Sequence, residues 1–242
     1  MKTKLTVIAL IIYCVVFSQT KQDQRVWFAY IGQFKVSEKW GGHLEAQFRL
    51  DNQLEQNLQN LFRIGGVYFL SSRANITAGY ALVNTYNVSQ DAFFKENRLW
   101  EQYQLNTKWN ENKNTMTHRF RLEQRWVEQL STDVAIASTT NYQNRFRYLN
   151  RNLFHLLNLK SESDEVYAVL QNEVFFNLGD NKINSKFIDQ NRFLIGLGLN
   201  FRNNTRLELG YMNHLLTFSK GDNVMNHTVS VSLLQNLDLQ KQ

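Results

Sequence analysis

The chain has 242 residues, of which 43% are hydrophobic and none is proline, and its formal net charge is +6. Its single cysteine, Cys14, excludes a disulfide framework within the chain. Its basic and acidic residues are interspersed, which argues against the clustered basic face of a nucleic-acid-binding protein. Because proline cannot donate a hydrogen bond to a strand ladder, its absence permits long uninterrupted strands.

Residues 1–18 have the pattern of a cleaved signal peptide. A positively charged start precedes an apolar stretch over residues 5–17, and Val16 and Ser18 suit the −3 and −1 positions of a cleavage site. A membrane-spanning helix would need about 20 apolar residues, so this stretch is too short to be an anchor. We therefore expect export and a mature chain of residues 19–242.

The rest of the chain alternates apolar and polar side chains with a period of two, which is the pattern of β-strands. In residues 40–50, for example, Leu44 and Phe48 fall on one face, whereas Glu45 and Arg49 fall on the other. Eleven segments show this alternation: residues 24–36, 40–50, 61–70, 75–85, 95–109, 115–130, 142–159, 165–178, 190–201, 206–218 and 225–239.

The connections between these segments alternate in length. Short polar turns occur at residues 37–39, 71–75, 110–114, 160–164 and 202–205, and longer loops at 51–60, 87–94, 131–140, 179–188 and 219–224. Short turns on one rim and longer loops on the other are typical of outer-membrane barrels. The segments also exceed the five or six residues of a typical soluble strand. The sequence therefore predicts an all-β protein, an up-and-down antiparallel transmembrane β-barrel of about 10–12 strands.

The number of strands is a difficulty, because single-chain bacterial barrels have an even number. Eleven segments imply either a missed strand or a false one, so we expect twelve strands, with ten as the alternative. The segments at residues 24–36 and 61–70 are the least regular of the set.

Several tryptophans lie near segment ends, as expected for an aromatic girdle at a membrane interface. They are Trp27, Trp40, Trp109 and Trp126. Trp27, however, shares with Trp100 the parity that we assign to the lumen. Either a bulge re-aims these two side chains, or they are packed inside.

Arginines and glutamates recur on one face of the predicted strands. Near the middle of a bilayer, an arginine on the lipid side costs about 2–4 kcal/mol, so we expect these side chains to face the lumen. The residues of this ladder are Glu96, Arg98, Arg119, Arg121, Glu123, Arg125, Arg145, Arg147, Arg151, Glu173 and Arg192. Two interpretations stay open: an ion-pair network that fills a narrow barrel, or a cation-lined passage that favours anions.

Evidence for catalysis is weak. The histidines are isolated in sequence, and no two of them have the spacing of metal ligands. They are His43, His118, His155, His214 and His227. The sequence therefore predicts no catalytic residue, metal or cofactor, and the protein is expected not to be an enzyme. An outer-membrane lipid-active enzyme and a soluble periplasmic ligand-binding barrel stay as alternatives.

Five short segments taken together resemble a known bacterial family. They are residues 96–100 (ENRLW), 118–125 (HRFRLEQR), 145–148 (RFRY), 189–193 (DQNRF) and 208–211 (ELGY). With the strand around Trp27 and residues 78–81 (AGYA), they resemble the family called domain of unknown function 2490. The resemblance implies an outer-membrane β-barrel and implies no activity or functional residue. Unlike many barrels, the chain lacks a terminal aromatic residue and ends in LDLQKQ.

The sequence thus predicts a small non-enzymatic barrel in the outer membrane of a Gram-negative bacterium, either a narrow pore or a structural membrane protein with an Arg/Glu-lined lumen. Its expected partners are outer-membrane lipids, lipopolysaccharide and, during insertion, the barrel-assembly machinery. Nucleic acid is not an expected partner, and the sequence identifies no solute. If the barrel conducts, the arginine excess predicts a modest preference for anions.

Overall fold

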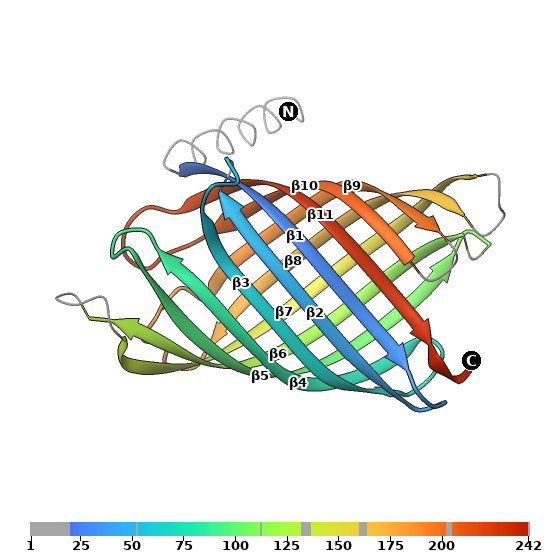
Figure 1. Ribbon diagram of the computed structural model, residues 1–242, viewed down its shortest axis with the longest axis horizontal. Helices are drawn as coiled ribbons and strands as arrows, with labels where there is room; N and C mark the ends of the chain where they lie inside the picture. The colour runs from blue at the N-terminus through green and yellow to red at the C-terminus, as the bar shows by residue number, and fades with distance from the viewer. Residues whose placement is uncertain are drawn as a thin grey trace, which may run out of the picture.

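The computed structural model describes residues 20–51, 53–111, 113–131, 137–159, 164–201 and 205–241. These residues form one closed β-barrel (Figure 1). The predicted signal peptide, residues 1–18, lies outside the described residues. Within the described ranges, no helix is both long enough and apolar enough to cross a membrane.

Each of the eleven segments with alternating sequence overlaps one strand, so the predicted all-β barrel is confirmed. A short 3₁₀ helix, η1 (Leu239–Lys241), follows the last strand. The strands are β1 (Lys21–Lys35), β2 (Trp40–Asp51), β3 (Asn57–Phe69), β4 (Ala74–Asn87), β5 (Ala92–Trp109), β6 (Asn114–Leu130), β7 (Ala137–Asn158), β8 (Glu165–Leu178), β9 (Ile188–Phe201), β10 (Thr205–Leu216) and β11 (Val224–Asp238).

The expectation of twelve strands is wrong, because the described chain closes with eleven. Each strand is antiparallel to its neighbours in the chain, and a ring of alternating strands with an odd count must contain one parallel pair. That pair is β1 and β11, in register from Lys21 opposite Val224 to Lys35 opposite Asp238. The parallel pairing leaves neither strand with an open edge.

The two rims of the barrel differ in their connections. The turn rim carries short links such as residues 36–39 and 70–73, whereas the loop rim carries the longer links 179–187 and 217–223. On the loop rim, Gly179 and Gly221 have φ angles of 74° and 82°, in the left-handed region that glycine adopts without a steric cost. Several loops are shorter than predicted, because β3, β5 and other strands extend further toward the loop rim.

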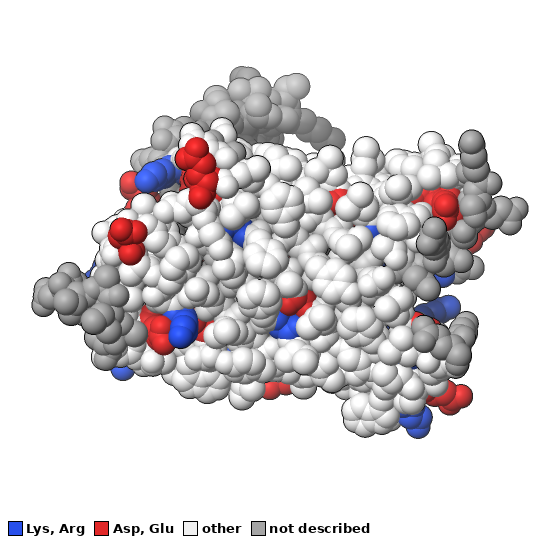
Figure 2. All heavy atoms as spheres, in the orientation of Figure 1, with Lys and Arg blue, Asp and Glu red and all other residues white. Residues whose placement is uncertain are grey.

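The wall has an apolar outer face and a polar inner face. Along β6, Phe120 and Leu122 are exposed on the outside, whereas Arg121 and Glu123 are buried on the inside. Figure 2 shows the result on one side: charged residues appear mainly toward the two ends, and the wall between them is largely uncharged. This arrangement reverses the usual order of a soluble protein, in which apolar side chains fill the interior.

The tryptophans divide between the two faces. Trp40, Trp109 and Trp126 are exposed on the outer wall, where an aromatic girdle would place them. Trp27 and Trp100 are inside, with exposed fractions of 9% and 1%. The prediction that Trp27 belongs to the girdle is therefore wrong, and the alternative of packing inside the barrel is correct.

The parallel β1–β11 pair can be tested with a disulfide. Ala29 and Ser232 are register partners on the inner face, so Ala29→Cys with Ser232→Cys should crosslink in most molecules. The crosslinked chain should migrate faster than the reduced chain on a denaturing gel. Ala29→Cys with Val231→Cys, whose side chains point to opposite faces, is the matched control. If the two pairs crosslinked equally poorly, β1 and β11 would not be neighbours.

Candidate functional site

All eleven residues of the predicted charged ladder lie on the inner face of the barrel. Eight are buried, whereas Arg119, Arg151 and Arg192 keep some exposure. Their strands alternate strictly in sequence, which is why successive odd-numbered residues of β6 and β7 point inward together. The ladder is therefore one three-dimensional cluster formed by β5, β6, β7, β8 and β9.

Glu123 of β6 is the centre of this cluster. It lies 2.7 Å from a guanidinium nitrogen of Arg145 and 2.7 Å from one of Arg147, both on β7. Arg98 of β5 lies 3.9 Å away, and Arg63 of β3 lies 3.4 Å away. Because β4 and β5 separate β3 from β6 in the wall, the contact with Arg63 reaches across the lumen.

Glu173 of β8 forms a second centre. Arg147 and Arg119 each lie 2.7 Å from it, and Arg192 of β9 lies 3.7 Å from it. Since Arg147 contacts both Glu123 and Glu173, the two centres form one continuous network. Buried charges of this kind are stable only when they are paired and hydrogen-bonded, which is the arrangement seen here.

Further ion pairs extend the network in both directions along the barrel. Toward the loop rim, Glu96 accepts hydrogen bonds from Arg98 and Arg125. Toward the turn rim, Arg151 of β7 pairs with Glu208 of β10, across two intervening strands. The hydroxyl of Tyr167 also donates to Glu208, at 2.8 Å. The lumen is thus bridged at two levels.

Aromatic rings support the arginines. The ring of Phe175, on β8, lies 4.4 Å from the guanidinium of Arg147 and 4.5 Å from that of Arg192. Trp100 lies 4.8 Å from the guanidinium of Arg121, which also donates to Gln102. Such cation–π contacts stabilise a cation that has left bulk water. Arg121 forms no ion pair with any residue that the structure describes.

A glycine in the wall makes room for Trp100. Gly65 of β3 and Gly79 of β4 are register partners, and Gly79 is also opposite Trp100. A Cβ atom on Gly65 would lie 2.9 Å from the indole ring, closer than real contacts allow. The missing Cβ of Gly65 therefore makes room for the indole ring, whereas a Cβ on Gly79 would collide with the backbone of Ile64 and Gly65.

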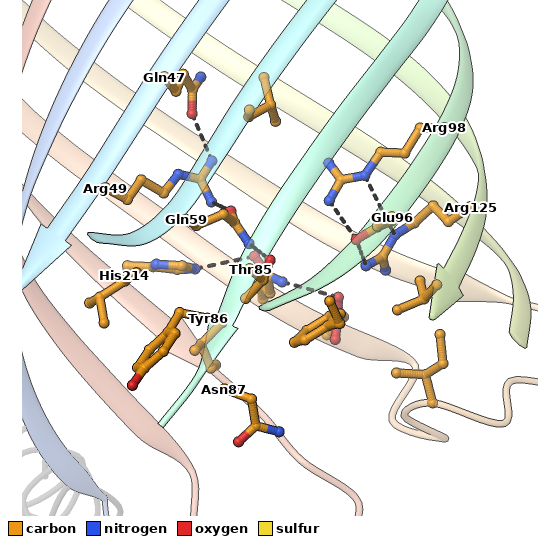
Figure 3. A pocket seen from close by; sticks show the side chains of 18 of the residues that line it. Gln47, Arg49, Gln59, Thr85, Tyr86, Asn87, Glu96, Arg98, Arg125 and His214 are labelled. Atoms are coloured by element: carbon orange, nitrogen blue, oxygen red, sulfur yellow. Dashed lines mark hydrogen bonds and ion pairs between the residues drawn. The ribbon is translucent and has the colours of Figure 1, made fainter. Parts of the chain in front are cut away.

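A cavity of about 500 Å³ lies on the loop-rim side of the network (Figure 3). We call it the vestibule. On β5 its lining includes Phe94, Glu96 and Arg98 but none of the described residues that follow, and on β6 the lining begins at Arg125. The ion-pair network therefore forms the floor of the vestibule, and the cavity does not continue past the network to the turn rim.

The predicted ladder contains only part of the charged interior. Glu45, which pairs with Arg63, and Arg49, which forms no ion pair with a described residue, both belong to the polar face of residues 40–50 and lie outside that ladder. Arg63 was missed because residues 61–70 appear apolar on both faces. Asp189 lies 3.3 Å from Arg145. It belongs to the DQNRF segment of the family resemblance and not to the predicted ladder. The alternation of β2 was the signal that could have identified Glu45 and Arg49.

The described histidines have separate environments. On the outer face, His118 lies 2.9 Å from the hydroxyl oxygen of Tyr148. Near the turn rim, His155 lies 3.0 Å from a carboxylate oxygen of Glu165. Inside, the ring of His214 packs edge-on against Trp27. Among the described residues, no group of three or more His, Cys, Asp or Glu side chains could hold a metal ion.

The fold and the site together define a closed β-barrel with an apolar wall and a lumen filled by arginine–carboxylate pairs. The family model described as "Protein of unknown function (DUF2490)" matches residues 24–225. The chain belongs to this family, and the resemblance inferred from sequence is confirmed. No curated protein and no solved structure matches the chain.

The role of Glu123 can be tested by stability. Glu123→Gln removes the charge shared by Arg63, Arg98, Arg145 and Arg147, so the four buried guanidinium groups face one another with one carboxylate fewer, although each keeps a second carboxylate partner. We expect the free energy of unfolding to fall by about 3–5 kcal/mol. Urea unfolding, followed by the heat-modifiable migration of the barrel on gels, measures the change.

The control for this experiment is Glu101→Gln on the outer wall. Glu101 accepts a hydrogen bond from Gln124 at 3.2 Å and forms no ion pair with a described residue. We expect Glu101→Gln not to destabilise the barrel, because no described cation depends on this carboxylate. Equal losses in both variants would contradict the central role of Glu123.

Proposed function

We propose that the protein is a non-enzymatic outer-membrane barrel with a sealed lumen, which acts as a structural or solute-binding membrane protein rather than as an open pore. The observation that carries this proposal is the meeting of arginines from β3, β5 and β7 on the single carboxylate of Glu123. These contacts occupy the space through which a solute would have to pass.

The outer wall supports membrane insertion. Large apolar side chains such as Ile64, Leu197 and Leu209 are exposed on it, and a continuous apolar surface is rare on soluble monomers. The strands run from 12 to 22 residues, enough for the nine to eleven that a tilted membrane strand requires. Outer-membrane lipids and lipopolysaccharide are the partners that this wall would contact, and the barrel-assembly machinery would insert it.

The energetics of the interior favour a seal over a conducting channel. Arg147 makes ion pairs of 2.7 Å with two carboxylates, and Arg151 adds a second bridge across the lumen toward the turn rim. Opening a passage would separate these charges, and breaking a buried pair costs about 3–5 kcal/mol. No single movement of one side chain would clear both levels.

The alternatives fit the interior less well. A soluble ligand-binding barrel would present polar side chains outward, which is the reverse of this wall. An enzyme needs an acid, base or nucleophile that is free to react. Glu123 and Glu173, the best-placed carboxylates, are instead each held by several guanidinium groups. This arrangement supports a non-enzymatic role.

Arginine substitutions on the outer wall test the membrane location. Ile195, 55% exposed, lies midway along β9, and Leu207, 44% exposed, lies near the turn rim on β10. In lipid bilayers, Ile195→Arg should destabilise the barrel by about 2–4 kcal/mol and Leu207→Arg by about 0–1 kcal/mol. Unfolding titrations in vesicles measure both. If neither substitution had an effect, the wall would face water.

Planar-bilayer recordings test the seal. The native protein should show no steady conductance. In Glu123→Ala, the arginines that share this carboxylate repel one another, and we expect brief openings that favour anions. Glu101→Ala on the outer wall should stay silent. A steady conductance in the native protein would overturn the sealed-lumen proposal.

A further inference from the structure

We infer that the vestibule binds a small amphipathic anion, with a carboxylate at Arg49 and a compact apolar body toward the mouth of the cavity. This inference rests on the proposed sealed barrel and adds a class of ligand to it. Four observations carry it: the environment of Arg49, the charge of the lining, the apolar side chains at the mouth, and the irregular backbone at Arg49.

Arg49, on β2, faces the vestibule without an acidic partner. Its guanidinium donates to the amide oxygens of Gln47 and Gln59, and lies 3.9 Å from the ring of Trp27. No described carboxylate forms an ion pair with it, whereas Arg98 and Arg125 in the opposite wall share Glu96 (Figure 3). The positive charge of Arg49 is therefore available to a bound anion.

The lining as a whole carries an excess of positive charge. It includes eight arginines against four acidic residues. Those four are already engaged: Glu45 by Arg63, Glu96 by Arg98 and Arg125, Asp189 by Arg145, and Glu128 by the backbone N–H of Lys95. An anion would meet the guanidinium of Arg49, whereas each of the other seven arginines of the lining pairs with a carboxylate, in part with Asp23, Glu123 and Glu173 outside the lining.

Apolar side chains line part of the mouth of the vestibule, beside polar ones such as Asn87 and Gln90. Tyr86, Leu130, Leu216 and Phe218 line it, and the indole ring of Trp27 lies deeper. A volume of about 500 Å³ falls within the range of small-molecule sites. A bare phosphate would leave the apolar surface uncovered, whereas an aromatic carboxylate would cover it and still reach Arg49.

The backbone changes register at Arg49. The pairing of β2 with β3 shifts between Arg49 and Leu50, an irregularity of the kind that re-aims side chains near binding sites. The Nε–H of Arg49 is also buried without a hydrogen-bond partner. A buried donor without a hydrogen-bond partner lowers stability and is rare in native structures. This loss of stability is explained if the position serves to hold Arg49 at the cavity.

Binding of 2-naphthoate to the purified protein tests the inference. Equilibrium dialysis in non-ionic detergent, corrected with protein-free micelles, gives the affinity, and 2-naphthalenemethanol is the neutral probe of the same shape. We expect the carboxylate to bind at least about tenfold more tightly than the alcohol, since a charge-assisted pair is the difference between them. Arg49→Gln should abolish that tenfold preference, and Arg49→Lys should retain most of it.

Arg121→Gln is the matched control, because Arg121 also lacks an acidic partner in the described structure but does not line the vestibule. It should bind 2-naphthoate as the native protein does. Equal binding of both probes, or equal losses in Arg49→Gln and Arg121→Gln, would overturn the inference. Heat-modifiable migration establishes that each variant is folded. If the native protein is folded and shows no conductance in bilayers but does not bind 2-naphthoate, the inference about the vestibule is wrong and the sealed-barrel proposal stands.

Discussion

The structure depends on the neutralisation of arginines inside a closed wall. Guanidinium groups can be placed in a narrow lumen only if carboxylates and aromatic rings replace the water that they lose. Glu123 and Glu173 meet this requirement by each serving several arginines, and Phe175 and Trp100 serve arginines beside them. The network in turn holds strands that are distant in the wall, because Arg63 on β3 and Glu123 on β6 are bonded through the interior. The same contacts that stabilise the barrel therefore cross its lumen.

The closure of the barrel and the pairing of its inner charges depend on each other. The barrel has no open edge, because β1 and β11 pair in parallel, and the inner face is consequently enclosed on all sides. Enclosure separates the inner charges from the surroundings of the outer wall and from much of the bulk water, so they must satisfy one another. Arg49 and Arg121 are the exceptions among the inner arginines discussed above, since amides and indole rings take the place of carboxylates around both. Of these two arginines, only Arg49 lines the vestibule.

Most of the fold could be predicted from the sequence, because most strands have one apolar and one polar face and the alternation continues along much of their length. The alternation also marks eleven segments, but the rule of even numbers, which assumes closure by an antiparallel pair, led to the expectation of twelve strands, and no local feature of β1 or β11 indicates a parallel pair. For the site, the alternation of β6 and β7 identified the arginines, but it could not show which carboxylates they meet. Arg63 illustrates the limit: its partner Glu123 lies 60 positions away in sequence, and its strand has apolar residues on both faces.

The odd number of strands has a topological consequence. Lys21 begins β1 at the loop rim, and Asp238 ends β11 at the turn rim, so the two ends of the barrel emerge from opposite openings (Figure 1). A barrel with paired hairpins alone returns its chain to the side from which it started. This chain starts at one opening of the barrel and ends at the other. In the proposed outer-membrane location, polypeptide joined ahead of Lys21 and polypeptide joined after Asp238 would therefore lie in two different aqueous compartments.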